Sequence, residues 1–110
     1  VAAIETLKAL KLYEATQPKI VQGKSIGQAF QFIDTGNAEL GFVALSQLAG
    51  QAAGSRWIVP QEYYTPIRQD AVLLKKGAGN AAATGFLAFL RGPEARAVIE
   101  KYGYALDAAR

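Results

Sequence analysis

The chain has 110 residues, carries 12 Lys or Arg against 9 Asp or Glu for a formal charge of +3, and contains no His and no Cys. The missing Cys excludes disulfides, a cysteine nucleophile and an iron–sulfur cluster, and the missing His excludes a Ser-His-Asp triad and the usual zinc sites. The basic residues are scattered rather than clustered, so the net positive charge does not indicate a nucleic-acid-binding surface.

The first predicted element is an amphipathic helix over residues 3–13, in which Ile4, Leu7 and Leu10 recur at helical spacing. No capping residue precedes it, so the chain is expected to open inside a helix with residues missing upstream; a frayed natural end is the alternative. No signal peptide is visible, and no apolar run approaches the roughly 20 residues that a membrane span needs.

A short strand is predicted over residues 19–22, and a second helix opens at Ser25. Gly36 is expected to end this helix in the left-handed conformation that glycine adopts easily. The helix has apolar residues at i, i+3, i+4 and i+7, which predicts one buried face. The residues of that face are Ile26, Ala29, Phe30 and Ile33.

Three further strands are predicted over residues 40–44, 57–59 and 68–75, with a short helical turn over 45–48. The run at 40–44 is continuously apolar, which is typical of a strand covered on both faces in a parallel sheet. Trp57 is expected to lie in the core.

Two helices are predicted near the end of the chain, over residues 81–90 and 94–102. Asn80 can cap the first of them, and Gly92 followed by Pro93 marks the boundary between the two. In the second helix the residues expected to face inward are Ala97, Val98 and Ile99. The alternation of helices with short strands predicts an α/β fold with a mainly parallel sheet.

The most informative local feature is the start of the helix at Ser25. Ser25 followed three residues later by Gln28 is a capping box, placed between a predicted strand and a helix. The backbone N–H groups of Ile26, Gly27 and Gln28 would then face the ligand crevice with the positive end of the helix dipole, which is an anion site without a charged side chain. An ordinary capped helix with nothing bound is the commoner explanation of such a motif.

Other polar and aromatic groups are weaker candidates for a functional site. Four carboxylates could include an acid/base pair, but none lies in a recognisable motif, so a solvated surface is the preferred explanation. A Lys pair could bind phosphate, and a Tyr pair could stack on a ligand or simply pack a loop. These groups are Asp34, Glu39, Glu62 and Asp70, then Lys75 and Lys76, then Tyr63 and Tyr64.

Three segments together resemble the family of periplasmic molybdate-binding proteins of molybdate ABC transporters, the ModA family. They are TGNAELGFVALSQ (35–47), RWIVPQEYYTPIRQDAVLLKKG (56–77) and FLAFLRGPEARAVIEKYGY (86–104). The resemblance implies a type II periplasmic-binding-protein-like α/β fold, in which two lobes of parallel-rich sheet flanked by helices close on a tetrahedral oxyanion. It implies a receptor rather than an enzyme, with no cofactor.

The family's members are longer, so the resemblance implies that this chain is an incomplete, C-terminal half. Residues 1–70 would be the second lobe, truncated at its N-terminus. Residues 71–110 would be the crossing strand and the C-terminal helices that return to the missing first lobe, with a hinge at Asp70 and Ala71. The apolar faces of that tail would need a partner, for example in a swapped or packed dimer, unless the tail folds back or belongs to a longer chain.

The resemblance also implies a ligand set. The backbone N–H of Ile26 would bind molybdate or tungstate, with Ser25, Gly27 and Gln28 as the supporting helix cap. Molybdenum would enter only as oxyanion, with no direct metal ligand. Some members use a Tyr where this chain has Ala44, so that hydroxyl is missing here.

The implied location is the periplasm, with the signal peptide outside this chain, and the implied partner is the membrane permease of the importer. Three alternatives stay open. They are a receptor for another oxyanion such as sulfate or phosphate, the effector-binding domain of a transcription regulator, and an enzyme that uses two of Asp34, Glu39 and Asp70.

Overall fold

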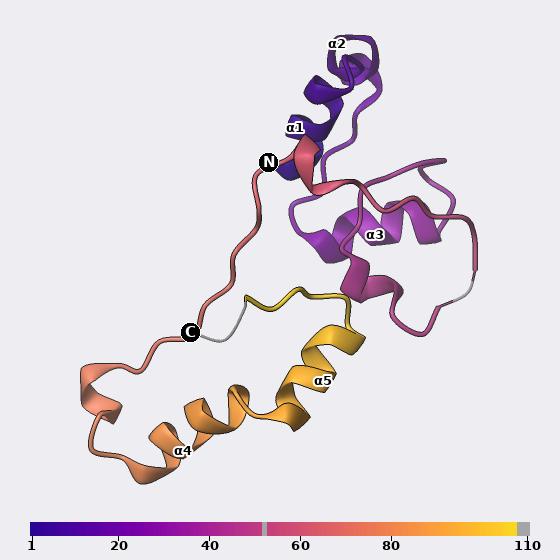
Figure 1. Cartoon of the computed structure of the whole chain (residues 1–110). Helices are drawn as coiled ribbons and strands as arrows, with labels where there is room; N and C mark the ends of the chain where they lie inside the picture. Colours follow the sequence, from indigo (N-terminus) through magenta and orange to yellow (C-terminus); the bar gives the residue numbers. More distant parts are fainter. Residues whose placement is uncertain (52, 108–110) are drawn as a thin grey trace. The chain divides into compact units, whose positions relative to one another are not determined.

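A computed structural model describes residues 1–51 and 53–107 of the chain (Figure 1). It divides into two compact units, the first over Val1–Ile67 and the second starting at Arg68. The first unit contains α1 (Ala2–Ala9), α2 (Tyr13–Thr16), η1 (Gln17–Lys19), α3 (Ile26–Asp34), η2 (Leu45–Leu48) and η3 (Gln61–Tyr63). The second contains η4 (Lys75–Gly77), α4 (Ala81–Leu90) and α5 (Pro93–Lys101).

The helix predicted over residues 3–13 is interrupted, so that prediction is wrong in its second half. Lys11 has a φ of +59°, a left-handed conformation that is uncommon for a residue with a Cβ atom. The N–H of Leu12 donates to the carbonyl of Leu7 at 2.8 Å, and the N–H of Lys11 donates to that of Lys8 at 3.0 Å. This pair of bonds is a Schellman motif, which ends α1 before α2 begins.

Helix α3 begins after Ser25 as predicted, and its end at Gly36 is also confirmed. Gly36 has a φ of +76°, and its N–H donates to the carbonyl of Ile33 at 3.0 Å. The predicted buried face is only half covered, because Ile26 is 66% exposed and the other members of the face are half-buried.

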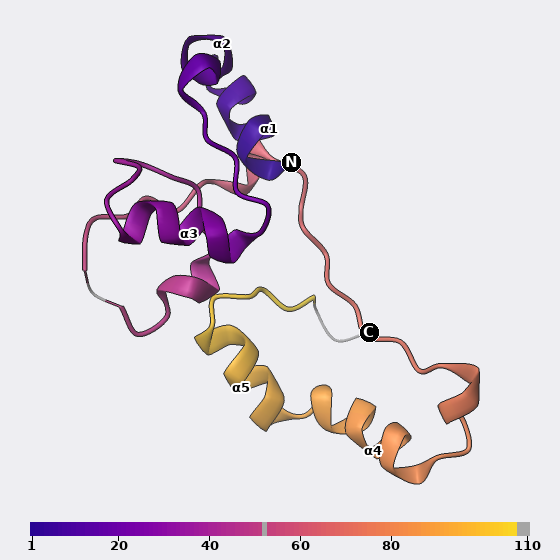
Figure 2. The ribbon, with the colours of Figure 1, turned by 180° about the vertical axis from the view of Figure 1, so that it is seen from behind.

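The predicted strands are absent from the described residues. Residues 41–44, 56–60 and 64–74 run as irregular or extended chain, drawn as coil from the front and from behind (Figure 1 and Figure 2). Strand hydrogen bonds require a neighbouring strand, and an apolar run without one stays open to solvent. Leu40 is 89% exposed and Phe42 is 40% exposed, so the expectation that the run at 40–44 is covered on both faces is wrong for this chain.

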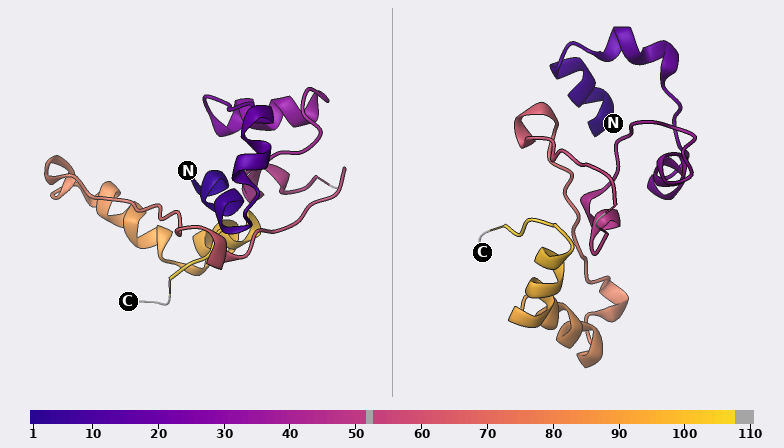
Figure 3. Two further views of the ribbon diagram at one scale, coloured as in Figure 1. Left: turned by 90° about the horizontal axis from the view of Figure 1, so that it is seen from above. Right: turned by 90° about the vertical axis from the view of Figure 1, so that its right-hand side faces the viewer.

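The helix predicted over residues 81–90 is confirmed at both ends, and the one predicted over 94–102 begins and ends one residue earlier, over Pro93–Lys101. The side-chain oxygen of Asn80 accepts from the N–H groups of Ala82 and Ala83 at 2.9 and 3.2 Å, which caps α4. Gly92 precedes α5, and Pro93 is its first residue. The two helices contact each other and follow directly in the chain (Figure 3).

The buried interior of the chain is small. Thr6 in the first unit and Ala95 in the second are the buried side chains among the described residues. The expectation for the last helix is wrong for two of its three residues: Ala97 and Val98 are exposed, Ile99 is half-buried, and Ala95 is the buried residue. Trp57 is 62% exposed, which corrects its predicted core position. The assignment of residues 1–70 and 71–110 to two lobes stays a prediction.

Candidate anion-binding site

Ser25 holds the start of α3 by its side chain. Its backbone is extended, with φ −148° and ψ 163°, and its Oγ accepts from the N–H of Gln28 at 3.1 Å. This half of the predicted capping box is confirmed. The other half is displaced by one residue, because Oε1 of Gln28 accepts from the N–H of Lys24 at 2.7 Å rather than from that of Ser25.

The cap decides which N–H groups remain for a ligand. The N–H of Gln28 is used by Ser25, so the expectation that it would be free is wrong. Ile26 and Gly27 occupy the first two helical positions, whose N–H groups have no carbonyl partner within a helix. Both residues are exposed. The start of α3 thus presents two adjacent donors to the outside.

The electrostatics of this helix start favour an anion. The first turn of α3 contains no acidic residue, so no carboxylate there offsets the positive end of the helix dipole. Lys24, which immediately precedes the cap, is exposed and adds positive charge. Backbone donors and a helix dipole are the ordinary elements of anion binding at a helix N-terminus.

Gln47 connects this helix start to the segment after the predicted strand at 40–44. Its Oε1 accepts from the N–H of Ala44 at 2.9 Å, and its Nε2 donates to the carbonyl of Ile26 at 3.0 Å. The N–H of Ala44 is therefore occupied. This bridge is not predicted from the sequence, although Gln47 follows Ala44 at the same spacing of three at which Gln28 follows Ser25.

The structure does not favour a functional site at the carboxylates, the Lys pair or the Tyr pair. All four of the carboxylates considered are exposed, as are both members of the Lys pair. Tyr63 and Tyr64 are half-buried, and the ring of Tyr63 lies 6.5 Å from that of Trp57 at an angle of 43°. This geometry favours loop packing for the tyrosines. The described residues contain no group of three or more His, Cys, Asp or Glu that could hold a metal ion.

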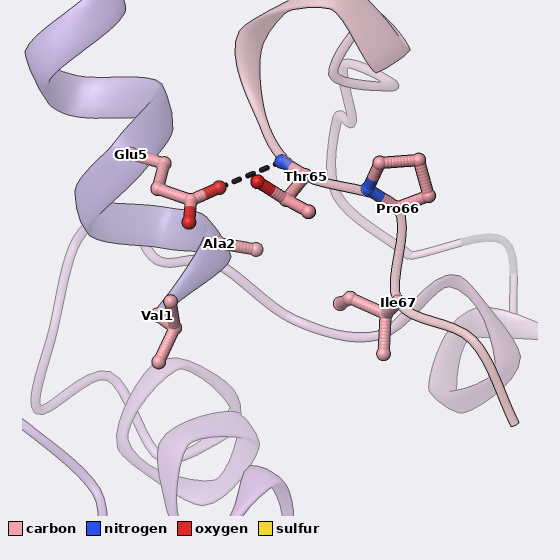
Figure 4. Close-up of a pocket in the computed structure, with 6 residues that line it drawn as sticks. All are labelled: Val1, Ala2, Glu5, Thr65, Pro66 and Ile67. Carbon is pink, nitrogen blue, oxygen red and sulfur yellow. Dashed lines mark hydrogen bonds between the residues drawn. The ribbon is translucent and has the colours of Figure 1, made fainter.

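A pocket of about 380 Å³ lies in the first unit, away from the start of α3 in the sequence (Figure 4). It is lined by Val1, Ala2, Glu5, Thr65, Pro66 and Ile67. In it the carboxylate of Glu5 accepts from the N–H of Thr65 at 2.7 Å. A carboxylate in the wall disfavours an anionic ligand, so this pocket does not compete with the α3 site.

The proposed hinge residues lie at the beginning of the second unit. Asp70 and Ala71 are exposed in a segment without regular structure. Nearby, Arg68 pairs with Asp107 at 2.8 Å, with both side chains more than half exposed. The role of Asp70 and Ala71 as a hinge stays a prediction.

No helix in the described part of the chain has the length and apolar character needed to cross a membrane.

Comparison with known proteins gives a consistent result. Residues 1–105 match the model of the family described as bacterial extracellular solute-binding protein. The molybdate-binding protein ModA of Rhodobacter capsulatus is 57% identical over 106 residues, covering 96% of this chain and 42% of that protein. ModA of Azotobacter vinelandii is 55% identical over 109 residues, covering 96% of this chain and 43% of that protein.

The solved structure of the periplasmic molybdate-binding protein of Azotobacter vinelandii matches with a TM-score of 0.83 at 40% identity. The match covers 97% of this chain and 48% of that one. The fold of this chain is thus similar to that of a solute-binding protein. The chain spans less than half the length of the curated relatives it matches. It belongs to the family of bacterial extracellular solute-binding proteins.

Proposed function

We propose that this chain is the C-terminal part of the solute-binding component of an ABC importer that captures molybdate or tungstate in the periplasm and delivers it to a membrane permease. In this proposal the anion is held by the backbone N–H groups at the start of α3, that of Ile26 foremost. The identity of 55 to 57% with two molybdate-binding proteins carries the proposal. The relatives are substrate-binding proteins rather than enzymes, which favours a receptor here.

The chemistry of the α3 start suits such a ligand. A divalent oxyanion presents only acceptors at neutral pH, so donor-only N–H groups match it, whereas a protonated anion would need an acceptor for its O–H. The helix dipole supplies positive charge without the cost of burying a Lys or Arg. Discrimination between molybdate and sulfate must then depend on the size of the complete cavity.

We further propose that the partners of the unformed strands lie in a part of the protein outside this chain. The exposed apolar side chains of 40–44 and 68–74 support this, because a parallel sheet would cover them. The same incompleteness predicts weak binding by these residues alone, since one lobe supplies only some of the hydrogen bonds. Micromolar or tighter affinity of the 110-residue chain for molybdate would contradict the proposal that a second lobe supplies part of the binding site.

The sharpest test removes one N–H without removing the helix. Proline is favoured at the first helical position, and the extended backbone of Ser25 is the conformation that a following proline requires. Ile26→Pro in the full-length protein should therefore keep α3 but lose the proposed donor. We expect the Kd for molybdate, measured by calorimetry, to rise by about tenfold or more, as for a lost hydrogen bond to a charged group.

Ile26→Ala is the matched control, because it changes the same side chain and keeps the N–H; its affinity should stay close to that of the wild type. Equal binding by Ile26→Pro would refute the assignment of Ile26. Competition among molybdate, tungstate, sulfate and phosphate on the wild type tests the ligand. Preference for sulfate or phosphate would mean that the natural ligand is that oxyanion instead of molybdate. Binding of none of the four anions would refute the proposed receptor function.

A further inference from the structure

Gln47 bridges two segments separated by 21 residues in the sequence. Its amide accepts from the N–H of Ala44 with one atom and donates to the carbonyl of Ile26 with the other. We propose that Gln47 is a positioning residue of the anion site, which fixes the direction of the Gly27 N–H. This inference rests on the function proposed above, and it concerns a residue that does not itself touch the anion.

Gln47 acts through the peptide unit that it contacts. The carbonyl of Ile26 and the N–H of Gly27 belong to the same planar peptide, in which the two groups point in opposite directions. A hydrogen bond that holds the carbonyl therefore also aims the N–H, on the side away from Gln47. The same bond polarises the peptide and strengthens its N–H as a donor.

The neighbouring donor is held in the same way. The N–H of Ile26 belongs to the peptide whose carbonyl is that of Ser25, and this carbonyl accepts from the N–H of Ala29 at 3.1 Å. The helix itself thus fixes the first donor. The carbonyl of Ile26, the first residue of α3, is likewise an acceptor of the helix, and Gln47 adds a second bond to it from outside the helix. Both outward donors of the α3 start are fixed from their carbonyl sides.

The chemistry of the bridge requires a carboxamide. One end must accept from an N–H and the other must donate to a carbonyl, which a carboxylate or a thioether of similar size cannot do. Gln47→Glu keeps the acceptor for Ala44 but sets a carboxylate oxygen against the carbonyl of Ile26. Gln47→Met removes both bonds and preserves the length of the side chain.

The experiment uses the full-length protein, with Gln47→Met compared with Gln31→Met. Gln31 is an exposed residue of α3 whose side chain makes none of the contacts described above, so it controls for the chemical change. We expect the Kd for molybdate to rise about three- to tenfold in Gln47→Met, the range for losing one hydrogen bond, here that between the Gly27 N–H and the anion, and to stay unchanged in Gln31→Met. Gln47→Glu should weaken binding at least as much, because it also places negative charge near the anion.

A second readout separates positioning from general stability. The amide signal of Gly27, followed by NMR during titration with molybdate, should shift in the wild type and in Gln31→Met, and much less in Gln47→Met. Wild-type affinity and an unchanged Gly27 shift in Gln47→Met would overturn the role of Gln47 while leaving the proposed function intact. Should the wild type bind no oxyanion, the proposed function fails and the role of Gln47 with it. If Gln47→Met does not fold, the Kd for molybdate and the Gly27 amide shift are measured on Gln47→Glu instead, and the same outcomes support or overturn the role of Gln47.

Discussion

Gly23 lies directly against the backbone of Ala29. A Cβ atom at Gly23 would stand 2.7 Å from the backbone nitrogen of Ala29 and 3.0 Å from the carbonyl oxygen of Ser25. Both of these atoms are main chain and belong to the first turns of α3, so neither can swing away as a flexible side chain could. The chain can approach the candidate site this closely because residue 23 has no side chain.

Gly23→Ala is therefore expected to destabilise the protein, because the added methyl group must push the start of α3 away. The loss should be about 1–3 kcal/mol, the usual cost of overpacking, measured by denaturant unfolding. Gly27→Ala is the matched control. A Cβ atom there would meet only Oγ of Ser25 at 3.7 Å, an ordinary contact, and Ala has the higher helix propensity. Destabilisation of equal size in both variants would contradict the close-approach argument.

The cap at Ser25 predicts a separation of stability from binding. Ser25→Ala removes the acceptor for the N–H of Gln28 and should cost about 1 kcal/mol of unfolding free energy. Ser25→Asp keeps an acceptor and favours the helix dipole, so stability should stay near the wild-type value. Its carboxylate would, however, repel an oxyanion at the neighbouring N–H groups.

Calorimetry with molybdate and a melting curve on both variants check this prediction. Binding that is weaker in Ser25→Asp than in Ser25→Ala, despite the better stability, is the expected order. The reverse order would argue against an anion at the start of α3, since the added charge would then have no ligand to repel.

The features that could be predicted from the sequence are those decided within one or two turns of chain. The caps at Ser25 and Asn80 use donors only two or three residues away. The helix end at Gly36 depends on the conformational freedom of one residue. Such features are set by local geometry, so they hold whatever surrounds the segment.

The features that could not be predicted depend on residues distant in the sequence. The bridge from Gln47 to Ile26 spans 21 residues, and the bond from Thr65 to Glu5 spans 60. Nothing in the local pattern says which carbonyl or carboxylate such a side chain will reach. The strand predicted over residues 40–44 is absent for a related reason. Its apolar pattern indicates that the segment could form a strand, but a strand also requires a neighbouring strand to pair with.

The break after α1 leads to a prediction about Lys11. Its φ of +59° costs a residue with a Cβ atom about 1 kcal/mol or more, whereas glycine adopts it freely. Lys11→Gly should therefore raise the unfolding free energy by about 0.5–1 kcal/mol in a denaturant titration. Lys11→Ala removes the same charged side chain but keeps the Cβ atom, so it should bring no such gain. A gain of equal size in Lys11→Ala would assign the effect to charge rather than to backbone conformation.

The extended segment around residues 41–44 predicts a difference between this chain and the full-length protein. In the chain, the N–H of Ala44 is bonded to Gln47, and no strand neighbours the segment within the described residues. The amides of Gly41, Phe42 and Val43 should therefore exchange with solvent rapidly in the 110-residue chain. In the full-length protein a neighbouring strand should protect them, and exchange should slow by orders of magnitude.

Hydrogen-exchange mass spectrometry on both proteins measures this difference. The α3 amides serve as the internal reference, since their bonds lie within the helix. Equal protection of residues 41–43 in both proteins would mean that their partner is already in this chain, which would overturn the proposal that the missing strands lie outside it.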